Sequence, residues 1–165
     1  MTRRRFLLAA PVRWRTVVAP PPGLRVREPT PDDAEALARL MHAAYRGGID
    51  DEGETPDDTR TTVRQLFEGA FGAMLWSVSE VAECDRELVA ATLLTLWSGG
   101  PFVAFAITAP GHRRRGLARS GLVRAMNRLA AGDETVLRLV VTQGNTAAEA
   151  LYESLGFRPQ AQPPY

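Results

Sequence analysis

The 165 residues of this chain are enough for one domain with a single core, and a composition of 45% hydrophobic and 24% charged residues excludes long disorder. No apolar run approaches the roughly 20 residues that cross a bilayer, and one cysteine, Cys84, with two histidines excludes an internal disulfide and a structural zinc site. A net charge of +1 does not require a nucleic-acid partner, and the lone cysteine favours a reducing, cytoplasmic compartment.

The first 22 residues are basic and end in a proline-rich linker, Ala19-Pro20-Pro21-Pro22-Gly23. They begin like a twin-arginine export signal, with Arg3-Arg4-Arg5-Phe6-Leu7, but Pro11 and two further arginines interrupt the apolar stretch that such a signal needs. We therefore expect residues 1–22 to be a flexible basic extension and residues 23–165 to form one domain.

Two amphipathic helices are predicted after a short strand at Leu24–Arg27. Thr30-Pro31-Asp32-Asp33 and Thr55-Pro56-Asp57-Asp58 each combine a capping residue, a proline suited to the first helical position and acids that favour the helix dipole. Apolar residues follow each start at the spacing of one helix face: Leu37, Leu40, Met41, Ala44 and Tyr45 in the first, and Val63, Leu66, Phe67, Ala70 and Phe71 in the second.

Three strands are expected next. Alternating apolar residues from Met74 to Val78 and the dense apolar run Leu88–Trp97 predict two of them, joined as an antiparallel hairpin by a polar turn at Cys84-Asp85-Arg86. Phe102–Thr108 predicts the third strand, which ends at Pro110-Gly111.

A helix, a strand and a short helix complete the domain. The strand, Val136–Thr142, is almost continuously apolar, as is typical of a strand covered on both faces, and the short helix opens with a capping box at Thr146 and closes at Leu155-Gly156. The longer helix has an apolar face of Ala118, Leu122, Ala125, Met126 and Leu129. This order of elements predicts a mixed α/β fold around a central sheet.

The junction between Phe102–Thr108 and the longer helix has the composition of an anion site. The first turn of a helix carries unpaired backbone N–H groups and the positive end of the helix dipole. Gly116 allows a bulky anion to approach the backbone, and Arg113, Arg114 and Arg115 add charge that can pair with phosphate oxygens. A solvated arginine run is the alternative, but cations are unfavourable at this end of a helix, so a diphosphate is the expected ligand.

Two motifs here resemble those of the GCN5-related N-acetyltransferase (GNAT) family. Arg113–Ala118 matches its acetyl-CoA-binding pattern Arg/Gln-x-x-Gly-x-Gly/Ala, and Asn145 with Ala150–Phe157 matches Asn…Ala-x-x-Tyr-x-x-x-Gly-Phe. The resemblance covers about residues 24–157 and implies a largely antiparallel central sheet flanked by helices. It also implies an enzyme that transfers an acetyl group from acetyl-CoA to a primary amine by direct attack in a ternary complex.

The resemblance assigns roles to individual positions. The strand before the motif would pair its main chain with the pantetheine arm and polarise the thioester carbonyl, and Tyr152 would be the general acid that protonates the departing thiolate. Core packing remains an alternative for Tyr152, as does helix capping for Asn145. The expected cofactor-binding residues are Ile107, Thr108, Arg113, Arg114, Arg115, Gly116, Leu117, Ala118 and Asn145; no metal is expected.

The family pattern is incomplete at the general base. Many members carry a glutamate on the strand that matches Phe102–Thr108, and this strand has none. Another group must then take the proton of the ammonium, unless the acceptor amine has a low pKa. The candidates are Glu80, Glu83, His42 and Tyr45. The missing glutamate also leaves open a non-catalytic module that binds CoA without transferring its acetyl group.

The chain also departs from the family after Phe157, where two more strands usually follow. The remaining residues are proline-rich, so at most one edge strand fits and the fold lacks the last strand. The open sheet edge would be covered by the basic N-terminal extension or by a partner chain, or left short and twisted. We expect a homodimer.

The acceptor is indicated only by charge. Six carboxylates lie within the nine residues of Asp50–Asp58, in the region that lines the acceptor cleft of the family, where they would attract a cationic amine. An acidic surface loop is the alternative. Small amines, a protein N-terminus and a lysine side chain all remain open, whereas nucleic-acid binding lacks any recognised motif.

Overall fold

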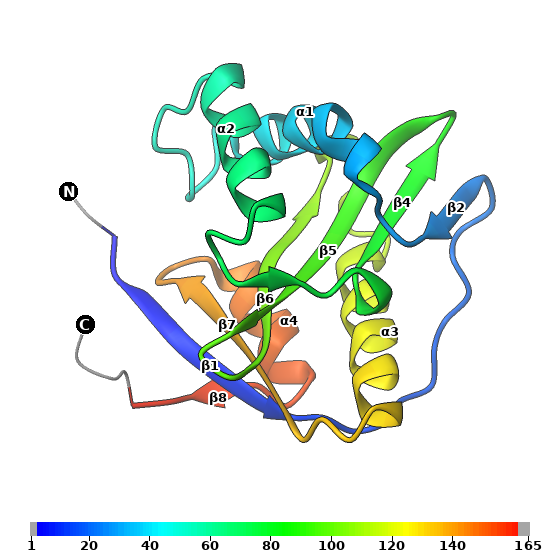
Figure 1. Ribbon diagram of the computed structural model, residues 1–165, viewed down its shortest axis with the longest axis vertical. Helices are drawn as coiled ribbons and strands as arrows, with labels where there is room; N and C mark the ends of the chain where they lie inside the picture. The colour runs from blue at the N-terminus through cyan, green and yellow to red at the C-terminus, as the bar shows by residue number, and fades with distance from the viewer. Residues whose placement is uncertain (1–2, 162–165) are drawn as a thin grey trace.

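One mixed sheet organises the chain (Figure 1). The computed structural model describes residues 3–161, and its strands lie in the order β2-β4-β5-β6-β7-β1-β8, with β3 pairing onto β5. Neighbouring strands are antiparallel except β6 and β7, which are parallel, so the expected fold class is confirmed. The strands are β1 (Arg5–Pro11), β2 (Leu24–Arg27), β3 (Ala73–Met74), β4 (Glu80–Cys84), β5 (Glu87–Trp97), β6 (Gly100–Thr108), β7 (Val136–Thr142) and β8 (Arg158–Pro159).

Helices α1 (Ala34–Tyr45) and α2 (Pro56–Phe67) cover one face of the sheet, as their apolar stripes predict. The cap of α2 is reciprocal, because Thr55 Oγ1 accepts from the Asp58 N–H at 3.2 Å and the Asp58 carboxylate accepts from the Thr55 N–H at 2.8 Å. The buried core on this face joins both helices to β4, β5 and β6; it includes Leu37, Leu40, Met41, Val63, Leu66, Val81, Leu93 and Ile107.

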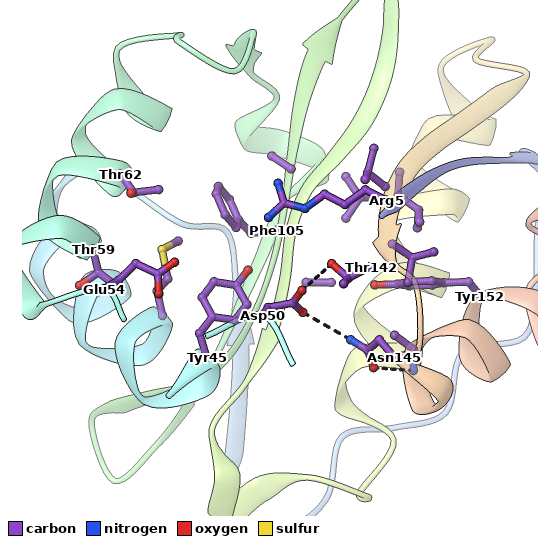
Figure 2. Close-up of a pocket in the computed structure, with 18 residues that line it drawn as sticks. Arg5, Tyr45, Asp50, Glu54, Thr59, Thr62, Phe105, Thr142, Asn145 and Tyr152 are labelled. Atoms are coloured by element: carbon purple, nitrogen blue, oxygen red, sulfur yellow. Dashed lines mark hydrogen bonds between the residues drawn. The ribbon is translucent and has the colours of Figure 1, made fainter. Parts of the chain in front are cut away.

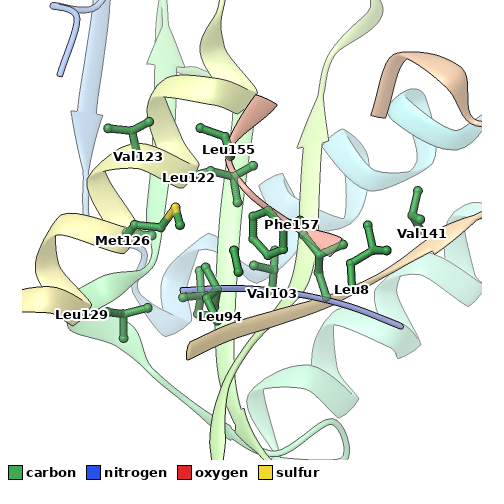
Figure 3. Close-up of a cluster of buried hydrophobic side chains, with 14 residues drawn as sticks. Leu8, Leu94, Val103, Leu122, Val123, Met126, Leu129, Val141, Leu155 and Phe157 are labelled. Carbon is green, nitrogen blue, oxygen red and sulfur yellow. The ribbon is translucent and has the colours of Figure 1, made fainter. Parts of the chain in front are cut away.

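Helices α3 (Leu117–Ala131) and α4 (Thr146–Ser154) cover the opposite face, where Figure 3 shows the larger core. Four residues of the predicted α3 stripe lie in this core: Leu122, Ala125, Met126 and Leu129. Phe157, at the end of the second motif, is only 2% exposed there. No helix within residues 3–161 combines the length and the apolar character needed to cross a membrane.

The N-terminal segment is not the flexible extension that its composition predicted. Arg5–Pro11 forms β1, which pairs with β7 over its whole length, from Arg5 opposite Thr142 to Pro11 opposite Val136. Leu8 is 7% exposed and packs in the core beneath α3. The physical reason is that the edge of β7 would otherwise leave its backbone groups unpaired, and the Phe6-Leu7-Leu8 run supplies a strand with an apolar inner face.

This pairing decides among the three ways of covering the sheet edge. The N-terminal segment covers β7, and the two residues of β8 then pair onto β1, so the single short strand expected after Phe157 is confirmed. The chain after β1 is also tied down. The Arg15 N–H donates to Asn127 Oδ1 at 2.8 Å, Asn127 Nδ2 donates back to the Arg15 carbonyl at 2.8 Å, and Arg15 Nη2 donates to the Leu155 carbonyl.

The strand predicted from Met74 to Val78 is wrong over most of its length. Only Ala73–Met74 pairs with β5, and Trp76–Val78 forms a 3₁₀ turn. The N–H and hydroxyl groups of Ser79 both donate to the Leu75 carbonyl, which closes the turn and competes with a sheet ladder. The strand of the hairpin begins one residue later, at Glu80.

The packing of β1 predicts an effect of Leu8→Ala on stability. Truncating this buried side chain should lower the free energy of unfolding by about 2–4 kcal/mol, because it leaves a cavity beneath α3. Val18→Ala is the matched control: it truncates a side chain that is 73% exposed and should change stability by less than about 0.5 kcal/mol. Chemical denaturation of both variants measures the difference, and equal, negligible effects would mean that the segment before residue 23 is not part of the folded domain.

Candidate active site

The two parallel strands β6 and β7 separate after a short contact. They pair only at Phe102 with Arg138 and at Val103 with Leu139, although both strands continue further. The register between β5 and β6 shifts at the same level, since Leu94 lies opposite Val103 and Leu93 opposite Phe105, so that Ala104 is left over as a bulge. The bulge bends β6 away from β7 and opens a fork in the sheet.

The fork exposes the main chain of β6 on the side that faces β7. The Ala109 N–H donates to the Val89 carbonyl at 2.8 Å, and backbone groups alternate in direction along an antiparallel strand. The polar groups of Ile107 therefore face β5, and those of Ala106 and Thr108 face the fork. The sequence predicted that Ile107 and Thr108 would contact the cofactor, and of these two only Thr108 has main-chain groups that face the fork. Ala106, which the sequence did not indicate, also faces it. The side chain of Ile107 packs in the core and is 4% exposed.

The end of β6 leads directly into an uncapped helix start. After the turn at Pro110–His112, Arg114 and Gly116 both adopt left-handed backbone conformations, with φ of 61° and 75°. No side chain caps α3, and its first intrahelical bond runs from the Ser120 N–H to the Gly116 carbonyl at 2.9 Å. The N–H groups of Leu117–Arg119 lie before that bond and point out of the helix, which makes this loop an anion cradle.

The three arginines of the motif have different roles in the structure. Arg113 Nη2 donates to the Ala44 carbonyl at 2.6 Å and so ties the cradle to the last turn of α1. Arg114 and Arg115 are exposed at the mouth of the loop. The sequence does not distinguish these three arginines. The structure does, because Arg113 binds α1 whereas Arg114 and Arg115 face solvent.

A cavity of about 330 Å³ occupies the fork (Figure 2). It is lined by residues of β6 and β7, and by α1, α2, α4, the loop between α1 and α2, and Arg5 of β1. Figure 2 shows Asp50 at its centre, with Tyr45 on one side and Thr142 and Asn145 on the other. Segments from both ends of the chain thus meet in one site.

Tyr152 has both of the roles that its sequence context suggested as alternatives. Its ring packs edge-on against Phe157, with ring centroids 5.8 Å apart, at the border of the core. Its hydroxyl points into the cavity (Figure 2). Burial, followed by the negative charge of Asp50, raises the pKa of Tyr152 to about 12, so the phenol holds its proton at neutral pH.

Asn145 caps α4 and lines the cavity at the same time. Its Oδ1 accepts from the Ala148 N–H at 3.3 Å, and its Nδ2 donates to Asp50 Oδ2 at 3.4 Å. The cap lies at Asn145, one of the two positions that the sequence suggested, and the box predicted at Thr146 does not form, because Glu149, three residues after Thr146, accepts from the Gly144 N–H. The side chain of Asn145 is therefore fixed at both ends, with its oxygen bound to the start of α4 and its nitrogen bound to Asp50 in the cavity.

Only one of the four base candidates lines the cavity. Glu80 is buried and pairs with Arg124 through two bonds of 2.6 Å, and Glu83 pairs with Arg27 at 2.8 Å; both lie away from the cavity, as does His42. Tyr45 does line it, and burial, with a further contribution from Asp50, raises its pKa above the ordinary value.

Two carboxylates that were not named as bases, Asp50 and Glu54, line the cavity together with Tyr45. Their signal in the sequence was the acidic segment between the first two helices, which does not show which of its six carboxylates turn inward. No group of three His, Cys, Asp or Glu side chains within residues 3–161 is placed to hold a metal ion.

Comparisons with known proteins agree with this geometry. Residues 84–163 match the family model described as FR47-like protein. No curated protein matches the chain in sequence. Among solved structures, a GCN5-related N-acetyltransferase from Sphaerobacter thermophilus superposes with a TM-score of 0.73 at 18% identity, covering 96% of this chain and 49% of that one. This chain therefore spans about half the length of that protein.

Two further neighbours are of similar size to this chain. The ribosomal-protein-S18-alanine N-acetyltransferase of Escherichia coli has a TM-score of 0.66 at 20% identity, covering 84% of this chain and 79% of that one. The PaiA N-acetyltransferase of Thermoplasma acidophilum, in complex with coenzyme A, has a TM-score of 0.66 at 14% identity, covering 85% and 92%. At these identities the likeness establishes the fold.

The chain has the fold of solved N-acetyltransferase structures. The FR47-like match covers residues 84–163, and these neighbours share the fold that the two motifs indicated by their resemblance to the GNAT family.

The left-handed conformation at Gly116 predicts a cost for a side chain there. A Cβ would meet no atom within 4 Å, so Gly116→Ala should lower stability only through the backbone, by about 1 kcal/mol. Gly111→Ala is the control, because Gly111 is equally open and its φ is not positive. Thermal unfolding of the two variants gives the comparison; equal midpoints would show that the cradle backbone relaxes at no cost.

Proposed function

We propose that the chain is an N-acetyltransferase that moves the acetyl group of acetyl-CoA to a primary amine by direct attack in a ternary complex. The observation that carries this proposal is that the fork between β6 and β7 runs without a break into the anion cradle at the start of α3. The free main-chain groups of β6 lead into the uncapped start of α3, and the Tyr152 hydroxyl lies in the cavity alongside them.

The cradle fits the diphosphate of the coenzyme. Its outward N–H groups and the helix dipole favour a doubly charged anion, and Arg114 and Arg115 lie where they would pair with further phosphate oxygens. The pantetheine arm carries amide groups, which can pair with the main chain of Ala106 and Thr108 in the fork. Coenzyme A bound to the Thermoplasma neighbour supports this reading for a chain of the same fold.

The chemistry requires one new bond, one broken bond and two proton movements. The amine nitrogen attacks the thioester carbonyl carbon, and a main-chain N–H of β6 aimed at the carbonyl oxygen would stabilise its negative charge. As the carbon–sulfur bond breaks, Tyr152 donates its proton to the sulfur, and the proton that the nitrogen releases returns through water to the Tyr152 oxygen. The high pKa of the Tyr152 phenol suits a group that must remain protonated until the thiolate leaves.

Two measurements test the function. Acetyl-CoA should raise the thermal unfolding midpoint, since it would bind only the folded chain. Free thiol should then be released from acetyl-CoA when amines are added, because only an enzyme frees CoA in response to an acceptor. Stabilisation without thiol release over a broad amine panel would indicate a non-catalytic CoA-binding module. The absence of stabilisation would contradict the proposal outright.

Tyr152→Phe tests the acid. Removing the hydroxyl keeps the ring packed against Phe157, so folding and coenzyme affinity should change little. Turnover should fall by about tenfold or more, equivalent to about 1.4 kcal/mol of transition-state stabilisation. Because the pKa of Tyr152 is raised to about 12, its proton should be retained as pH rises, and kcat of the parent protein should show no falling limb from this group below about pH 10. Unchanged turnover in the variant would exclude Tyr152 from the reaction.

A further inference from the structure

Four of the six carboxylates of Asp50–Asp58 lie outside the cavity and have partners. Asp51 accepts from the N–H groups of Gly47 and Gly53 at 2.6 and 2.8 Å and so shapes the turn before α2. Three further carboxylates also have partners: Asp58 caps α2, Asp57 forms an ion pair with Arg60, and Glu52 forms an ion pair with Arg5. Only Asp50 and Glu54 line the cavity.

Asp50 is held at the centre of the cavity by two donors from the far side of the fork. Thr142 Oγ1, at the end of β7, donates to Asp50 Oδ1 at 2.6 Å, and Asn145 Nδ2 approaches Oδ2 at 3.4 Å. Thr142 is 6% exposed, so the stronger of these bonds is sheltered from solvent. Each carboxylate oxygen can accept a second hydrogen bond, and Figure 2 shows the carboxylate between the rings of Tyr45 and Tyr152.

The loop approaches the fork from the face opposite the cradle. The loop joins α1 to α2, which pack on one face of the sheet, whereas α3, whose first turn forms the cradle, packs on the other. A coenzyme seated on the cradle would present its thioester in the fork, and Asp50 would then meet the second reactant. The charged groups that line the cavity are Arg5, Asp50 and Glu54, and Arg5 already pairs with Glu52 at the rim.

We propose that Asp50 binds the ammonium group of the acceptor, so that the acceptor is an alkylamine that enters as a cation. This inference rests on the proposed acetyltransferase function and adds the substrate class and the residue that selects it. A carboxylate is a much weaker base than an alkylamine, so Asp50 binds the ammonium and orients it toward the fork. The ammonium then loses one proton to water before its nitrogen attacks, in addition to the proton that the nitrogen releases after the attack. Thr142 and Asn145 position the carboxylate, and Glu54 adds a second negative charge in the same cavity.

Asp50→Asn is the decisive variant, because it removes the charge and keeps an oxygen that can accept from Thr142. Its matched control is Asp57→Asn, the same change at a side chain that is 89% exposed on α2 and outside the cavity. Both are assayed with benzylamine and butane-1,4-diamine, which are cations at pH 7.5, and with aniline, which is neutral there. Asp50→Ser, which also keeps an oxygen acceptor, replaces the first variant if that one fails to fold.

The expected result is a change in selectivity and not a general loss. For the better alkylamine, kcat/KM should fall by about tenfold or more in Asp50→Asn, mainly through KM, while the value for aniline changes by less than about threefold. Asp57→Asn should match the parent protein with every amine, and acetyl-CoA should stabilise all variants equally. Equal losses for alkylamines and aniline, or loss of acetyl-CoA stabilisation, would reduce Asp50 to a structural role and overturn the inference.

The parent protein separates failure of this inference from failure of the proposed function. Thiol release with aniline but with neither alkylamine would overturn the ammonium site and leave acetyl transfer standing. If no amine releases thiol although acetyl-CoA stabilises the fold, the proposed function fails, and the acceptor inference fails with it.

Discussion

The incomplete pairing of β6 and β7 is the constraint on which the rest of this structure depends. Two strands that share only two register positions leave main-chain donors and acceptors unpaired inside a folded domain. Such groups are costly to bury without partners, so a native structure either closes the gap or uses it for a ligand. The bulge at Ala104 keeps the gap open, and the cavity of about 330 Å³ occupies it.

An open fork weakens the sheet at its middle, and β7 is therefore held from its other side. The full-length pairing of β1 with β7 supplies that support, and β1 is itself anchored because Leu8 packs in the core beneath α3. The same strand brings Arg5 to the cavity, where it pairs with Glu52 of the acidic loop. A segment that stabilises the sheet thus also organises the wall of the candidate site.

Two contacts connect the halves of the site on either face of the sheet. Arg113 binds the last turn of α1 and fixes the cradle relative to the loop that follows this helix. Asp50 reaches from that loop to Thr142 and Asn145 at the other side of the fork. The position of the acidic loop is therefore set both by the cradle side of the site and by the end of β7.

Local patterns by themselves determined most of the elements, because capping boxes, apolar periodicity and glycine–proline breaks act over a few residues. The helix α3 and the strand β7 lie where these patterns placed them, and α2 begins at its predicted cap but ends at Phe67, before Ala70 and Phe71 of the predicted stripe. The motif around Gly116 likewise specified an anion cradle, since an uncapped helix start after a left-handed glycine is a local property. Only the tertiary structure decided which residues serve as the walls of the cavity. Arg5–Pro11 belongs to a segment with the composition of a tail and becomes a strand because a distant edge needs a partner. In the same way, Asp50 is singled out from six similar carboxylates by its contacts with Thr142 and Asn145, which lie more than ninety residues away in the chain and which no local pattern encodes.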